Sequence, residues 1–152
     1  MSDKLKAVIH YIIETKKVEN LTHRKLQKLL YYAYAWNIVL SANRNRLFPE
    51  TFEAWVQGPV LRAVHAKYKN NKDKFIKKSK LENIDYKLTF DEEQIIDETI
   101  LVYGDFLDDE LEEISRNEQP WKNARGNLRS LDKCYNKLSD EDIFKCYNER
   151  IK

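Results

Sequence analysis

The chain has 152 residues, of which 42% are hydrophobic and 34% charged, and its net charge is only +2. This length suits one domain with a substantial hydrophobic core. Three glycines and three prolines are few, which argues against an all-β sandwich with its many tight turns. No apolar run approaches the ~18 residues of a membrane span. The charged N-terminus also lacks a signal-peptide pattern, so we expect a cytoplasmic protein with no membrane partner.

The charges are distributed unevenly along the chain. Residues 1–80 hold 17 Lys and Arg against 6 Asp and Glu, whereas residues 81–152 hold 10 against 19. The two parts therefore carry +11 and −9, which sum to +2. Such asymmetry can mark a nucleic-acid patch. We expect instead that the two halves fold together and that their electrostatic fields partly cancel.

Periodicity predicts a first helix over residues 3–17 and a second from Asn20 or Thr22 to about Ala42. The second helix contains KLQKLLYYAYAW, residues 25–36, whose apolar side chains lie on both sides of a helical wheel. A surface helix would have a polar side, and this one has none. The pattern therefore predicts either a central helix wrapped by its own domain or a helix with one side that meets a partner. The wider apolar arc, from Leu26 to Leu40, is expected to face the other helices.

Alternation of apolar and polar residues over positions 52–56 indicates a possible small β element. Gly58-Pro59 is expected to break the chain and begin a third helix, because proline suits the first helical turn. Further helices are predicted at 91–104, at 108–115, at 120–125 as a short turn or helix, and after a capping Ser139. The expected fold class is mainly α: a single compact domain of about six helices around a central hydrophobic helix.

Groups for catalysis or metal binding are sparse in the sequence. His10, His23 and His65 fall on three separate predicted elements and have no metal-ligand spacing. No nucleophile-elbow, phosphate-loop or dinucleotide motif occurs. Cys134 and Cys146 lie twelve residues apart without a CxxC pair, so we expect free thiols. The residues favour a protein that is not an enzyme and has no catalytic residue, metal or cofactor.

Three longer strings occur in a fixed order: LQKLLYYAYAW, then LFPETFEAWVQGPV, then LEEISRNEQPWKNAR. Together they resemble the three blocks of the Panacea domain of SocA-like antitoxins, also called the phage-associated GepA-like family. The resemblance extends over nearly the whole chain, so residues 1–152 are expected to form a single Panacea domain. Ser115-Arg116 stands where the family usually has Thr-His, and Gln57 stands where it usually has Tyr.

Members of this family act as antitoxins encoded beside a toxin, and they work by protein binding. The resemblance therefore implies the antitoxin of a type II-like toxin–antitoxin system, which neutralises a cognate toxin by direct binding. One alternative is a proteolytic adaptor that delivers the toxin to an ATP-dependent protease. Another is a nucleic-acid-binding regulator of its own operon, which the basic run 62–80 would favour, although nucleic acid is the less expected partner.

Binding energy at interfaces is concentrated in a few buried anchors, among which Trp, Tyr and Arg are enriched. On the second helix, the narrow side with Gln27, Lys28 and Tyr31 is the best candidate for meeting the toxin. If Lys28 and Tyr31 are instead buried within the monomer, that assignment fails and the motif is scaffold. The partner-binding residues expected from the three motifs are Gln27, Lys28, Tyr31, Tyr32, Trp55, Trp121 and Arg125.

Overall fold

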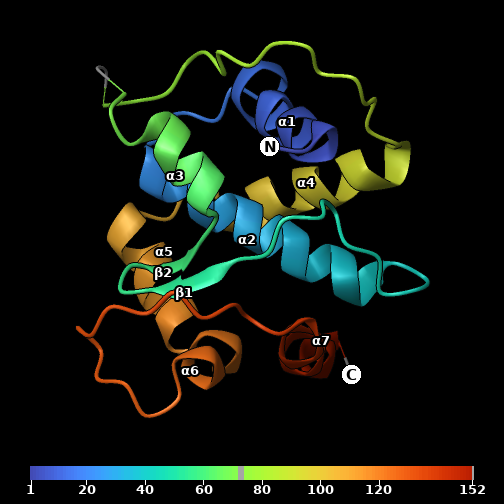
Figure 1. Cartoon of the computed structure of the whole chain (residues 1–152). Coiled ribbons are helices and arrows are strands. Elements are labelled where there is room, and N and C mark those ends of the chain that lie inside the picture. The colour runs from blue at the N-terminus through green and yellow to red at the C-terminus, as the bar shows by residue number, and fades with distance from the viewer. Residues whose placement is uncertain (72–73, 152) are drawn as a thin grey trace.

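The computed structural model describes residues 1–71 and 74–151 (Figure 1). Within these ranges the chain forms seven α-helices, one π-helical segment, one 3-10 segment and a two-stranded sheet. The prediction of a mainly helical domain with one small β element is confirmed, with one helix more than expected. The elements are α1 (Asp3–His10), η1 (Tyr11–Thr15), α2 (His23–Leu40), β1 (Glu53–Trp55), β2 (Gly58–Val60), α3 (Arg62–Tyr68), α4 (Phe90–Tyr103), α5 (Asp108–Arg116), α6 (Gln119–Arg125), α7 (Asp140–Asn148) and η2 (Glu149–Ile151).

Helix α2 runs through the middle of the molecule, and α3, α4, α5, α7 and β2 all contact it (Figure 1). Its start is capped by Thr22, whose hydroxyl accepts the N–H of Lys25 at 3.1 Å. Both sides of the helix are buried, which confirms the prediction of a central helix. The buried arc was predicted to extend to Leu40, and this is wrong. Leu40 is 55% exposed because it ends the helix at the rim of a shallow apolar pocket between α2 and α4.

The two strands form an antiparallel hairpin in which Ala54 pairs with Pro59 and Trp55 with Gly58. The free edge of β1 is covered by the segment around residue 137, because the N–H of Ala54 donates to the carbonyl of Asn136 at 2.8 Å. The prediction that Gly58-Pro59 begins a helix is wrong: these residues form β2, and α3 begins at Arg62. Proline is accepted in β2 because this strand is the other edge of the sheet.

Ion pairs join the basic first half of the chain to the acidic second half. Lys16 pairs with Asp97 at 3.3 Å, and Arg46 pairs with Asp140 at 2.7 Å. The two halves therefore fold together, as expected.

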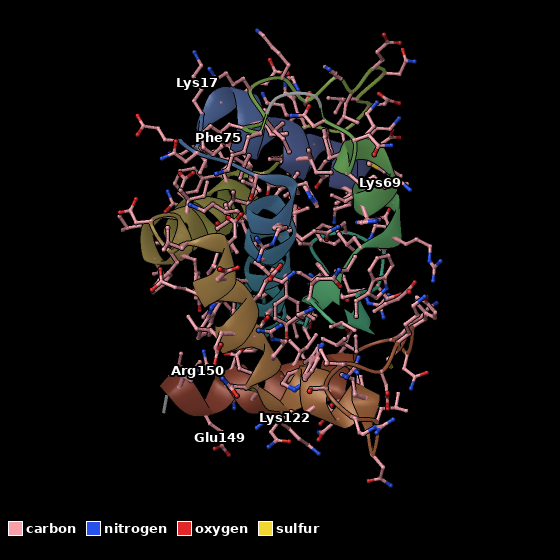
Figure 2. All side chains as sticks on the ribbon, turned by 90° about the vertical axis from the view of Figure 1, so that its left-hand side faces the viewer. Lys17, Lys69, Phe75, Lys122, Glu149 and Arg150 are labelled. Atoms are coloured by element: carbon pink, nitrogen blue, oxygen red, sulfur yellow. The ribbon has the colours of Figure 1, made fainter. Side chains whose placement is uncertain are left out.

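The side chains labelled in Figure 2 lie at the two ends of the molecule. Lys17, Lys69 and Phe75 lie toward the end formed by α1 and α3, whereas Arg150 lies at the opposite end beside α6 and α7 (Figure 2).

None of the helices within residues 1–71 and 74–151 is long and apolar enough to cross a bilayer. Both cysteines are free thiols, as predicted.

Candidate functional site

A pocket of about 250 Å³ opens where the start of α2 meets α3, α5 and the β hairpin. These four elements lie beside one another on the left of the molecule in Figure 1. Three of the predicted partner-binding residues line this pocket: Gln27, Lys28 and Trp55. We call it the motif pocket, and its full lining is His23, Arg24, Gln27, Lys28, Trp55, Gln57, Val60, His65 and Glu112.

Lys28 is a positively charged side chain that is buried in the lining of the motif pocket. Its side chain is only 1% exposed, and its Nζ donates to the carbonyl of Pro59 at 3.0 Å. An ammonium group has three N–H donors, and among the described residues this carbonyl is its one acceptor. No carboxylate in the described ranges lies within ion-pair distance of Nζ. Burial lowers the pKa of Lys28 to about 8, while the negative charge of Glu112 opposes that shift.

The lowered pKa of Lys28 predicts that its own contribution to stability increases as the pH rises above 8. Between the folded pKa of about 8 and the unfolded value near 10.4, the unfolded chain binds more protons at Lys28 than the folded chain. The contribution of Lys28 to the free energy of unfolding should therefore rise by about 2 kcal/mol from about pH 7.5 to 9.5. Cys146 and the buried tyrosines contribute in the opposite direction, because burial raises their pKa. Denaturant unfolding at both pH values measures it.

The matched variant for this measurement is Lys28→Met. The free energy of unfolding of the wild type minus that of the variant should rise by about 2 kcal/mol between the two pH values. The charged groups nearest to Lys28 are Arg24 of α2 and Asp108, Glu112 and Arg116 of α5. None of these four is a lysine, tyrosine or cysteine, the types that ordinarily titrate in this range. An identical pH dependence in the wild type and in Lys28→Met would contradict the assignment.

Gln27 fixes the hairpin to the central helix. Its Nε2 donates to the carbonyl of Leu61 at 2.9 Å, and its Oε1 accepts the N–H of the same residue at 2.8 Å. Both bonds are buried, so the amide continues the hydrogen bonding of β2 where the strand ends. Gln27 therefore positions the wall of the motif pocket.

Two histidines and a tryptophan form the opposite wall. The rings of His23 and His65 lie 6.1 Å apart, and His65 meets Trp55 edge-on at 4.9 Å. Burial lowers the pKa of both histidines, so both are mainly neutral at pH 7. The sequence predicted that these histidines lie on separate elements, and it did not predict that their rings meet. The one available signal was weak: each lies a few residues from a block of the family pattern.

Glu112 is the buried acid of the motif pocket, and Arg24 occupies both of its oxygens. The Nε of Arg24 donates to Oε2 at 2.9 Å and its NH2 donates to Oε1 at 2.6 Å. Arg24 also pairs with Asp109. This two-bond fork occupies both oxygens of Glu112, so the acid makes no direct ion pair with Lys28 and acts on it only through its charge at a distance.

Tyr31 and Tyr32, the other predicted partner-binding residues on α2, lie in the core away from the motif pocket.

Trp121 and Arg125 lie on α6, and both donate hydrogen bonds to backbone carbonyls of β1. The Nε1 of Trp121 donates to the carbonyl of Trp55 at 2.8 Å, and the NH1 of Arg125 donates to that of Ala54 at 2.8 Å. Their role in the described fold is structural.

The seven predicted partner-binding residues differ in how far they are buried. Lys28 and Tyr31 are each 1% exposed, which meets the criterion set for scaffold and leaves a group that enters the motif pocket as the one route to Lys28. Gln27, Tyr32, Trp121 and Arg125 are buried as well, whereas Trp55 is half-buried at the mouth of the motif pocket. Partner contact through these side chains stays a prediction, and Trp55 is the one of the seven that a docking surface reaches directly.

Comparison with known proteins identifies the family of the chain. A family model described as antitoxin SocA-like, Panacea domain, matches residues 26–122. No curated protein and no solved structure gives a significant match. The matched residues contain most of α2, the hairpin, α3, α5 and the start of α6, and thus part of every element that lines the motif pocket. The lining residues His23 and Arg24 lie just before the match. Since the match covers more than half of the chain, this protein belongs to the SocA-like antitoxin family with a Panacea domain.

Proposed function

We propose that this protein is the antitoxin of a type II-like toxin–antitoxin pair and that it neutralises its cognate toxin by direct, stoichiometric protein binding in the cytoplasm. The observation that carries the proposal is the family match over residues 26–122. An antitoxin family supports a protein partner and a role without catalysis. We further propose that residues 1–152 act as one domain, since α7 packs on α2 and α6.

Co-expression with the product of the neighbouring reading frame tests this function. We expect that product to arrest bacterial growth when expressed alone, and growth to return when this protein is induced with it. The two proteins should then co-elute as one complex of fixed stoichiometry. Continued growth arrest, with this protein present in folded form and the toxin shown to be active alone, would count against the proposal.

Two further measurements separate the alternatives. For a proteolytic adaptor, the toxin level falls only when both this protein and an ATP-dependent protease are present, and it stays constant in a protease-deficient host. For an operon regulator, the protein retards its own promoter DNA with a steep dependence on salt. The observation that favours this last alternative is a group of exposed lysines, namely Lys67, Lys69, Lys74, Lys77, Lys78 and Lys80. Direct binding requires neither result.

A further inference from the structure

We propose that the motif pocket receives a carboxylate side chain, Asp or Glu, from the partner protein and that Lys28 is its counter-charge. The assignment of the carboxylate to a toxin rests on the proposed function. The assignment of a carboxylate site to this pocket rests on the geometry and electrostatics of its lining and does not need the toxin.

The first argument is that the ammonium of Lys28 has no direct ion-pair partner among the described residues. Lys28 is buried against a single carbonyl oxygen, and the nearest buried acid, Glu112, is already held by both donors of Arg24. A buried charge is costly unless it is paired and hydrogen-bonded. An incoming carboxylate supplies the acceptors that the other N–H groups of Lys28 lack, so the pocket favours an anion over a neutral group.

The second argument is the position of α2. This helix has 18 residues and begins at His23, so its first turn, with His23 and Arg24, lines the pocket. The positive end of a helix dipole favours an anion. Together with the buried ammonium it sets the sign of the occupant.

The third argument separates a carboxylate from a phosphate. Phosphate sites commonly use arginine forks, and here the guanidinium of Arg24 is committed to Glu112 and Asp109. Apart from the neutral amides of Gln27 and Gln57, the remaining donors are one ammonium and two mainly neutral imidazoles, His23 and His65. One positive charge with neutral donors matches the single charge of a carboxylate.

The fourth argument is size and access, which indicate a protein side chain rather than a cofactor. The volume of about 250 Å³ lies below the roughly 300–1,000 Å³ of small-molecule sites. The mouth is formed by half-buried Trp55 and His65 and exposed Gln57, while Lys28 lies at the buried inner wall. A tryptophan beside a charged anchor point is typical of interface hot spots.

The experiment uses N-acetyl-glutamate amide as the probe and N-acetyl-glutamine amide as the neutral control. Both are titrated at pH 7 into the full chain while NMR follows the imidazole resonances of His23 and His65 and the indole N–H of Trp55. We expect saturable shifts with the acid and about tenfold weaker binding of the amide, because a charge-assisted hydrogen bond is lost.

Two buried lysines of α2 give a matched pair of variants. Lys28→Met should weaken binding of the acid about tenfold. Lys25→Met should leave it unchanged, because Lys25 is also buried but its Nζ donates to the carbonyl of Gly104 at 2.9 Å, outside the pocket lining. If Lys28→Met does not fold, the Nζ resonance of Lys28 in the wild type decides, since it must shift with the acid and not with the amide.

Equal binding of acid and amide, or full binding by a folded Lys28→Met, would overturn the carboxylate site. Because the probe assay needs no toxin, it fails independently of the proposed function. Probe binding without toxin protection would refute the antitoxin role and leave the pocket assignment standing. Toxin protection without probe binding would refute the pocket assignment alone.

Discussion

Replacing Glu118 by alanine is expected to lower the free energy of unfolding by about 2–4 kcal/mol. Glu118 is 7% exposed and lies where α5 ends and α6 begins. It accepts the phenol of Tyr32 at 3.0 Å and that of Tyr147 at 2.6 Å, and it pairs with Arg150. Burial raises the pKa of both tyrosines, so both stay protonated and donate. Without the carboxylate, two buried hydroxyls lose their acceptor.

Denaturant unfolding of three variants tests the role of Glu118. Glu118→Gln keeps an acceptor oxygen for the phenols and loses only the charge, so its loss should be smaller than that of Glu118→Ala. Glu113→Ala is the control, since that acid is exposed and sits 4.0 Å from Arg116, and it should change stability by less than about 0.5 kcal/mol. A loss below about 1 kcal/mol for Glu118→Ala would contradict the network.

The Glu118 network also explains why the central helix could be predicted from its sequence. A stretch with Tyr31, Tyr32 and Tyr34 and no polar side must be covered, and the partners are rings from distant elements. Tyr32 stacks on Tyr103 of α4 at 4.0 Å, and Tyr31 meets Tyr147 of α7 at 6.4 Å. Helical periodicity and the absence of Gly and Pro are local properties, so the sequence alone carries them.

Helix ends were predictable for the same local reason. Ser139 was expected to begin the last helix, and its hydroxyl accepts the N–H of Asp142 at 3.3 Å. The motif pocket was not predictable in this way. A helical wheel shows that Gln27 and Lys28 share a side, but it does not show whether another element covers that side. The covering strand and α3 come from more than thirty residues farther along the chain.

The error at Gly58-Pro59 has a similar physical origin. Proline fits both the first turn of a helix and an edge strand, so local propensity does not decide between them. In the folded chain, Gln27 decides by hydrogen-bonding the backbone of Leu61 across 34 positions. The meeting of His23 and His65 depends on the same long-range placement of α3.

Gly58→Ala is expected to lower the free energy of unfolding by about 2–5 kcal/mol, because it adds backbone strain to a steric clash. Gly58 has a φ of +108°, which L-residues rarely adopt. A Cβ at this position would lie 2.7 Å from the Oγ of Ser115 and 2.9 Å from the Cε of Lys28. Both neighbours are buried, so neither side chain moves into solvent to make room.

Two comparisons divide this loss into its parts by denaturant unfolding. Gly126→Ala carries backbone strain without the clash, since its φ is +61° and no atom lies within 4 Å of the added Cβ, so its loss should be the smaller one. The double variant Gly58→Ala/Ser115→Ala removes the hydroxyl that meets the new methyl group and should be more stable than the sum of the single changes implies. Strict additivity would show that the methyl group does not meet Ser115, and a steric clash with Ser115 would then be excluded as a cause of the loss.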